Sequence, residues 1–330
     1  MRGLKGALLL LGLTLLGLIL WRVGPGAVVG ALRPIGWGVP VLILAYLPVW
    51  ILDTLGWKFA FPAGSPRVSL MRLFRIRLSG EAFNVLTPTL DLGGEAVKAL
   101  LLTREGVPRV QALASVVVAK TSLAVAEVLF LLAGMWVAVQ VFALPAPLQR
   151  GMGLTLLLGG VGVGIFVLLQ RRGLFGAVAR LSRRLGLARR FWREQAPAVA
   201  ALDEVLRAYY ARPGRGALSV GFHLMGWLAG AAEVALILWF LDLPVTAASA
   251  LALEAGHQLI RAAAFFIPAK LGAQEGGSLI LFSALGFPAA LGVAVSLLRR
   301  VRELAWVALG LLLLAGGGGG GLPLGELGQS

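Results

Sequence analysis

Long apolar runs dominate the chain and recur at intervals that suit membrane-spanning helices. They occupy residues 4–21, 35–57, 110–142, 152–170, 216–241 and 288–314. A helix rises about 1.5 Å per residue, so about 20 residues cross the roughly 30 Å hydrocarbon layer of a bilayer. The pattern predicts an all-α polytopic membrane protein with about six full spans. We interpret the first run as an uncleaved anchor rather than a signal peptide, because no small-residue cleavage motif follows it.

Two further segments, 78–103 and 246–285, are apolar at both ends but polar or turn-forming in the middle. Pro88 and Glu95 interrupt the first segment, and Pro268 and Glu275 interrupt the second. Each half is too short to cross a membrane alone. Irregular backbone at membrane depth persists only inside protein or beside an aqueous cavity. We therefore expect each segment to form a broken helix or a re-entrant helical hairpin.

The two broken segments match at one fixed separation, from Pro88 to Pro268, which we call the repeat offset. The other pairs at this offset are Glu95 with Glu275, Gly106 with Gly286, Pro108 with Pro288, and Lys120 with Arg300. Three full spans lie between the segments, and an odd number of spans reverses the orientation. This predicts an inverted repeat, with repeat 1 at about 35–142, repeat 2 at about 216–314, and one hairpin entering from each side. Inverted repeats of this kind are typical of secondary transporters.

Composition narrows the class of protein. The chain is 58% hydrophobic and 14% charged, whereas soluble domains carry about a quarter charged residues. This excludes a soluble enzyme, a disordered chain and a nucleic-acid-binding domain. We expect one transmembrane domain over 1–314 and a disordered Gly-rich tail over 315–330.

Basic residues predict the orientation. The net charge is +15, and eleven arginines fall within 171–215. We expect this segment to form amphipathic helices on the cytoplasmic leaflet, with a solvated cytoplasmic loop as the alternative. A second basic stretch runs from Lys58 to Arg77. Because both stretches and the N-terminal cations fall on one side, the positive-inside rule predicts a cytoplasmic N-terminus in the cell inner membrane.

Several kinds of chemistry have no residues to support them. The chain has no Cys and only two His, so thiolate chemistry and a His-rich metal site are not expected. No phosphate-binding GxxxxGK[ST] loop and no nucleophile arrangement is present. We therefore expect no metal, no cofactor and no enzymatic activity. The tryptophans near span ends are expected to anchor the protein at the membrane interfaces. They are Trp21, Trp57, Trp239 and Trp306.

The broken segments resemble a known family. The matching residues are Asn84, Pro88, Gly93-Gly94-Glu95 and Lys98, then Pro268, Leu271-Gly272, Gln274-Glu275-Gly276-Gly277 and the run at 296–303. Together they resemble the flippase-like membrane domain of lysylphosphatidylglycerol synthases and its stand-alone relatives, including hopanoid-associated members. Residues 89–92 depart from the compact Gly/Arg turn of many relatives. The resemblance implies movement of an anionic or charged-headgroup lipid between leaflets, such as a phospholipid, a polyprenyl phosphate or a hopanoid-type lipid.

Ionisable residues inside the predicted spans are the candidate substrate-binding groups, because charge at membrane depth is costly and usually faces a cavity. The candidates are Asn84, Pro88, Glu95, Lys98, Lys120, Arg261, Lys270, Glu275 and Arg300. Lys120 and Arg300 are the best placed to hold a phosphate. The alternative is that Glu95 and Glu275 neutralise them in structural ion pairs, and both hold if ligand and carboxylate compete for one cation.

Two functions remain open at this point. The first is a flippase that binds membrane lipids by an anionic headgroup. The second is a non-transporting scaffold or accessory subunit of a lipid-biosynthesis enzyme. A homo-oligomer is a further candidate assembly, and nucleic acid is not an expected partner.

Overall fold

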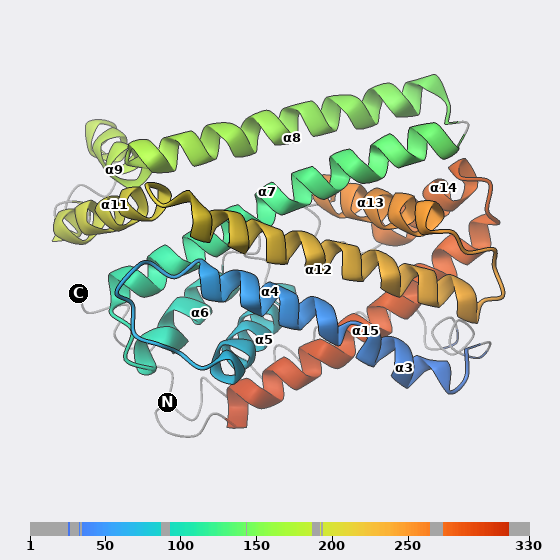
Figure 1. Ribbon diagram of the computed structural model, residues 1–330, viewed down its shortest axis with the longest axis horizontal. Coiled ribbons are helices and arrows are strands. Elements are labelled where there is room, and N and C mark those ends of the chain that lie inside the picture. The colour runs from blue at the N-terminus through green and yellow to red at the C-terminus, as the bar shows by residue number, and fades with distance from the viewer. Residues whose placement is uncertain are drawn as a thin grey trace.

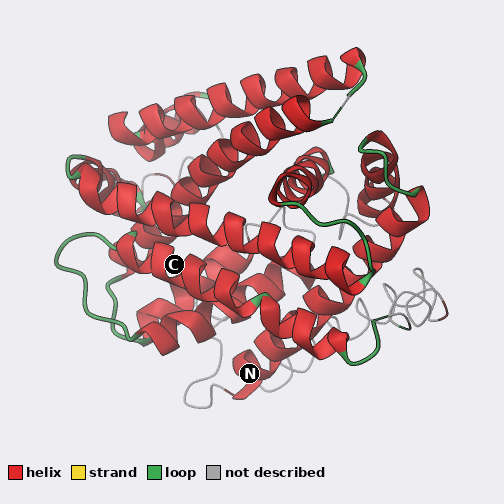
Figure 2. Cartoon of the chain, turned by 45° about the vertical axis from the view of Figure 1, so that its right-hand side comes forward, coloured by secondary structure: helices red, strands yellow, loops and turns green. Residues whose placement is uncertain are grey.

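The computed structural model describes residues 26, 33, 35–86, 93–142, 144–186, 192, 194–264 and 273–316. Throughout this part of the chain the regular secondary structure is helical, which confirms the all-α prediction (Figures 1 and 2). Pro88, Lys270, the apolar run at 4–21 and most of the Gly-rich tail lie outside the described residues.

Within the described residues, four stretches are long and apolar enough to cross a membrane: Gly38–Phe59, Arg109–Val141, Gln149–Arg172 and Pro213–Phe240. They contain α3 (Gly38–Ala45) with α4 (Leu47–Phe59), α7 (Arg109–Val141), α8 (Ala146–Arg172) and α12 (Pro213–Phe240). Each falls on an apolar run of the sequence. The helix α15 (Ala289–Gly316) matches the last run in length, at 28 residues, but carries four charged side chains near its middle.

The two broken segments each form a pair of short helices. The first pair is α5 (Leu70–Leu86) with α6 (Gly93–Arg104), and the second is α13 (Ala247–Ala263) with α14 (Ala273–Ala284). The helices of each pair pack against each other. In the first pair, the side-chain oxygen of Asn84 accepts a hydrogen bond of 2.6 Å from the backbone N–H of Gly94, which satisfies a donor at the start of α6.

The long helices cross the short ones closely. In the bundle α5 packs along α15, α13 packs along α7, and α12 packs along both α4 and α7. Glycines lie at two of these crossings. A methyl group at Gly310 of α15 would collide with the backbone of Leu78, and one at Gly134 of α7 would collide with Ala255. Small residues let helix backbones approach in this way, which is how membrane helices pack.

The helix α8 lies at the edge of the bundle beside α7 (Figure 1). Only 11% of its most apolar window is buried inside the protein. The exposed side chains include Leu154, Leu157, Leu158 and Leu168. In a bilayer this face contacts lipid, because so many exposed leucines would be unfavourable in water.

The described part of the arginine-rich segment includes the amphipathic helices α9 (Leu174–Arg184) and α11 (Ala196–Tyr210). α11 packs on α7, α8 and α9. On α9, Leu181 is exposed among arginines. The buried Asp203 of α11 holds the start of α9, because its carboxylate accepts hydrogen bonds from the backbone N–H groups of Phe175 at 3.1 Å and Gly176 at 2.7 Å.

Replacing Asp203 with alanine is expected to loosen α9 without unfolding the bundle. Loss of a carboxylate that caps a helix start costs about 1–2 kcal/mol. Hydrogen exchange of the α9 backbone should therefore accelerate, whereas exchange in α7 should not change. Glu204→Ala, at the exposed neighbouring position, is the matched control, and unchanged α9 exchange in the Asp203 variant would contradict the role given to this carboxylate.

Candidate functional site

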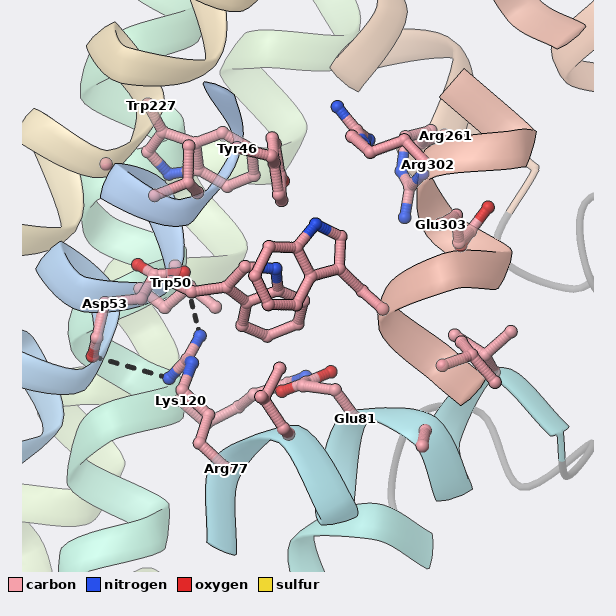
Figure 3. A pocket seen from close by; sticks show the side chains of 18 residues that line it. Tyr46, Trp50, Asp53, Arg77, Glu81, Lys120, Trp227, Arg261, Arg302 and Glu303 are labelled. Carbon is pink, nitrogen blue, oxygen red and sulfur yellow. Dashed lines mark hydrogen bonds and ion pairs between the residues drawn. The ribbon is translucent and has the colours of Figure 1, made fainter. Parts of the chain in front are cut away.

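A cavity of about 200 Å³ lies where α4, α5, α7, α12, α13 and α15 meet (Figure 3). Its charged wall residues are Asp53, Arg77, Glu81, Lys120, Arg261, Arg302 and Glu303, and its aromatic wall residues are Tyr46, Trp50, Trp227 and Trp306. So many ionisable groups inside an apolar helix bundle mark a candidate binding site, because burying charge without a ligand or a partner is costly.

The first charged cluster joins α4, α5 and α12. The Asp53 carboxylate accepts a hydrogen bond from Arg77 Nη2 at 2.8 Å and contacts His223 Nδ1 at 2.7 Å. Arg77 Nη1 also donates to the backbone carbonyl of Asp53 at 3.4 Å. Arg77 is only 5% exposed and His223 is fully buried. Asp53 thus fixes both partners, and Arg77 reaches the cavity wall with one edge of its guanidinium already occupied.

The second cluster ties the first hairpin to α7. Lys98 of α6 donates to Glu81 of α5 at 2.5 Å and to Glu95 at 2.9 Å. Glu95 also lies 3.5 Å from the ammonium of Lys120 on α7. These residues surround a small second cavity that shares Arg77, Glu81 and Lys120 with the first. A chain of alternating charges therefore runs from the hairpin to the main cavity.

The third cluster connects α12, α13 and α15. Arg302 donates to Glu233, which is 2% exposed, and Arg299 donates to Glu254 at 2.6 Å. The guanidinium of Arg302 also lies 3.7 Å from the centre of the Tyr46 ring, a cation–π contact. Arg302 therefore reaches the cavity from α15 with an acid behind it and an aromatic ring against its face.

Aromatic residues of α4 and α15 contact each other at the cavity wall. The rings of Trp50 and Trp306 have centroids 5.9 Å apart, and Trp306 Nε1 donates to the backbone carbonyl of Ile43 at 3.1 Å. The expectation that Trp57 and Trp306 anchor the protein at the interfaces is wrong. They are 1% and 7% exposed, so they pack inside the bundle, whereas Trp239 is 64% exposed.

The structure brings some of the candidate residues to the cavities and leaves others away from them. Lys120 and Arg261 line the main cavity, and Glu95 and Lys98 line the smaller one. Asn84 holds the hairpin together through Gly94. Pro88 and Lys270 lie outside the described residues.

The ion pairs foreseen as the alternative for Lys120 and Arg300 are present. Arg300 Nε donates to Glu275 at 2.7 Å, and neither residue lines the two cavities. Lys120 lies 3.5 Å from Glu95, yet 44% of its side chain remains exposed. Of these two cations only Lys120 is placed at a cavity, where a ligand and Glu95 can both reach it.

Sequence reasoning misses several wall residues. It does not single out Asp53, Trp50 or Arg302, and it groups Arg77 with a basic stretch outside the spans, although Arg77 is buried against Asp53. One pattern could have pointed to Asp53. Asp53 and Glu233 are separated by the repeat offset, each inside an apolar run, and each pairs with an arginine at the cavity.

Three pairs of wall residues are also separated by the repeat offset. They are Tyr46 with Gly226, Glu81 with Arg261, and Leu123 with Glu303. Positions separated by the repeat offset therefore come together at this cavity. The two residues of a pair can differ in charge. Glu81 is an acid, whereas its equivalent Arg261 is a cation, and both line the cavity.

The cavity wall offers several groups that can bind a ligand. Among the described residues, no group of three or more His, Asp or Glu side chains could hold a metal ion. The wall offers guanidinium, ammonium and indole N–H groups to a ligand, and carboxylates that hold those groups in place.

Comparison with known proteins agrees with the membrane architecture. A family model described as the lysylphosphatidylglycerol synthase TM region matches residues 6–311. No curated protein and no solved structure shows significant similarity to the chain.

Proposed function

The chain belongs to the family of the lysylphosphatidylglycerol synthase TM region, and from this premise we propose that it moves a lipid with a phosphate or other anionic headgroup between the two leaflets of the cell inner membrane. The family ties the chain to a membrane lipid-related function. Transport is the activity we infer within that function, because a charged cavity inside a helix bundle gives a headgroup a polar place at membrane depth.

An inverted repeat is part of this proposal, and the helix boundaries support it. The first residues of α6 and α14 are separated by the repeat offset, as are those of α7 and α15. The packing pairs are also reciprocal, since α5 lies along α15 and its equivalent α13 lies along α7. In Figure 1 the α5–α6 and α13–α14 pairs lie at opposite ends of the bundle. We propose that both pairs are re-entrant hairpins, one from each side of the membrane.

The mechanism follows from where the cavity lies. A charge at the centre of a bilayer costs at least several kcal/mol, which is why headgroups cross slowly unaided. The headgroup would enter the cavity while its tail stays in lipid. One side of the site is tightly packed, because α12 lies along α7, whereas the cavity separates much of α4 from α15. Rocking of the two halves about the cavity would exchange the packed and the open side.

The distribution of basic residues supports an orientation of the protein in the membrane. The helices α9 and α11 carry the arginine-rich segment at one end of the bundle (Figure 1). By the positive-inside rule we place this end, and with it the N-terminus, on the cytoplasmic side.

One observation carries the proposal: seven charged side chains from α4, α5, α7, α13 and α15 line one cavity of the helix bundle. The test is lipid movement by the purified full-length protein in vesicles of phosphatidylcholine. A fluorescent phosphatidylglycerol placed in both leaflets is exposed to a membrane-impermeant quencher. With a transporter, the quenched fraction should pass the roughly half expected for the outer leaflet and approach completeness.

Protein-free vesicles and vesicles with an unrelated helical membrane protein are the controls. Quenching that stops at the outer leaflet, for phosphatidylglycerol and for other phosphate-headgroup lipids alike, would contradict transport. A non-transporting scaffold or accessory subunit would then be favoured. The exposed arginines of α9 are the observation that supports this second candidate, because they offer a surface for an acidic partner.

A further inference from the structure

Four buried nitrogen atoms on residues of the cavity wall have no hydrogen-bond partner among the described residues. They are Trp50 Nε1, Trp227 Nε1, Arg77 Nε and Arg302 Nε. All four are donors. Leaving a buried donor unpaired costs about 1–3 kcal/mol, so native proteins rarely gather several at one place. A wall with only donors left over is suited to a group that accepts hydrogen bonds.

Both arginines are held in position by an acid behind them. Arg77 uses its terminal nitrogens on Asp53, and Arg302 uses Nη1 on Glu233. Figure 3 shows that the side chains of Trp50, Arg77 and Arg302 come from three different helices around the cavity, with the guanidinium of Arg77 turned toward Asp53. Because these side chains are fixed before a ligand arrives, little conformational freedom is lost when it binds.

The charges at the wall also favour an anion. Asp53 is engaged by Arg77 and His223, and Glu81 is engaged by Lys98. Arg261, in contrast, makes no hydrogen bond or ion pair within the described part of the chain, and its charge faces the cavity. A cationic headgroup would find the nearby carboxylates already occupied, whereas an anion would meet unused N–H groups and a guanidinium that no described carboxylate neutralises.

From these observations we propose that the cavity holds the phosphate-type oxyanion of the transported headgroup, with the N–H groups of Trp50, Trp227, Arg77 and Arg302 as its donors. This rests on the proposed function and specifies the ligand chemistry of the same site. It also moves the centre of recognition from Lys120 and Arg300 to residues of α4, α5, α12 and α15. At about 200 Å³ the cavity is smaller than sites for whole drug-sized ligands, so it takes the headgroup and leaves the tails outside.

The test compares tryptophan variants that remove one N–H and keep an aromatic ring. Binding of dihexanoyl phosphatidic acid to the purified full-length protein in detergent is measured by calorimetry. Trp50→Phe and Trp227→Phe should each weaken binding about tenfold, because a hydrogen bond to a charged group is lost. Trp239→Phe is the matched control. This tryptophan of α12 is 64% exposed and does not line the cavity, so binding should stay within about twofold of wild type.

Two further probes identify the source of the anion. Inorganic phosphate should bind far more weakly than the lipid, and a cationic lipid with the same dihexanoyl chains should not compete. Equal affinity for inorganic phosphate would make free phosphate the ligand and overturn the assignment to a lipid headgroup. Competition by the cationic lipid, or wild-type binding by both Trp50→Phe and Trp227→Phe, would overturn the anion site.

The binding test and the transport test can give independent results, so failure of one proposal is distinguishable from failure of the other. If phosphatidic acid binds as expected but no lipid crosses vesicles, the proposed transport is wrong and the anion site stands. If lipid crosses at the wild-type rate in both tryptophan variants, transport stands and this site is wrong.

Discussion

Replacing Glu233 with leucine is expected to lower the free energy of unfolding by about 3–5 kcal/mol, which is the usual cost of removing one partner from a buried ion pair. The carboxylate of Glu233 accepts a hydrogen bond from Arg302 and lies 3.8 Å from Arg299. Without it, Arg302 would be buried with no carboxylate bound to it. Unfolding of the purified protein in detergent, followed by tryptophan fluorescence against denaturant, measures the change.

Two companion variants separate the ion pair from a general effect of losing an acid. Glu204→Leu removes an exposed acid from α11 and should change the free energy of unfolding by less than about 0.5 kcal/mol. The double variant Glu233→Leu with Arg302→Leu should regain part of the loss, because no charge is then left unpaired there. Wild-type stability in the single Glu233 variant would contradict the buried ion pair.

Replacing Leu123 with tryptophan is expected to stop lipid movement while leaving the fold in place. Leu123 of α7 lines both cavities, so a larger apolar ring there occupies the space proposed for the headgroup. We expect the headgroup to lose at least about 1.4 kcal/mol of binding free energy, which lowers its affinity about tenfold. The rate of lipid movement should then fall at least about tenfold. The measurement is the vesicle assay with fluorescent phosphatidylglycerol.

The control for this variant makes the same substitution on the lipid-facing surface. Leu158→Trp lies on α8 at a side chain that is 63% exposed, so it should transport as the wild type does. Wild-type transport by the Leu123 variant would show that the headgroup does not pass through this cavity. A scaffold that binds no lipid there would tolerate both substitutions in its cellular role.

The sequence predicts the long helices well. The apolar runs at 110–142 and 216–241 correspond to α7 and α12 within a few residues. The spacing of Glu95 and Lys98 places them on one helix face, and the two side chains lie 2.9 Å apart. Length and local spacing carry this information, because they depend only on helix geometry.

The burial of individual residues is predicted less well. The sequence places Arg77 outside the spans and Trp306 at an interface, yet both are buried at the main cavity. In a membrane helix the face toward lipid and the face toward protein are both apolar, so hydrophobic periodicity does not tell which face is buried. The position of a residue along a helix likewise does not reveal which neighbouring helix it meets.

The sequence by itself determined that this is a helical membrane protein, where most of its spans lie, and which positions recur at the repeat offset. Those properties follow from apolar run length and residue spacing. Only the tertiary structure decided which charges share one space. Asp53 meets Arg77 across 24 residues of sequence, and Arg302 meets Glu233 across 69. Such pairs depend on how helices rotate and cross, which packing of the whole bundle sets.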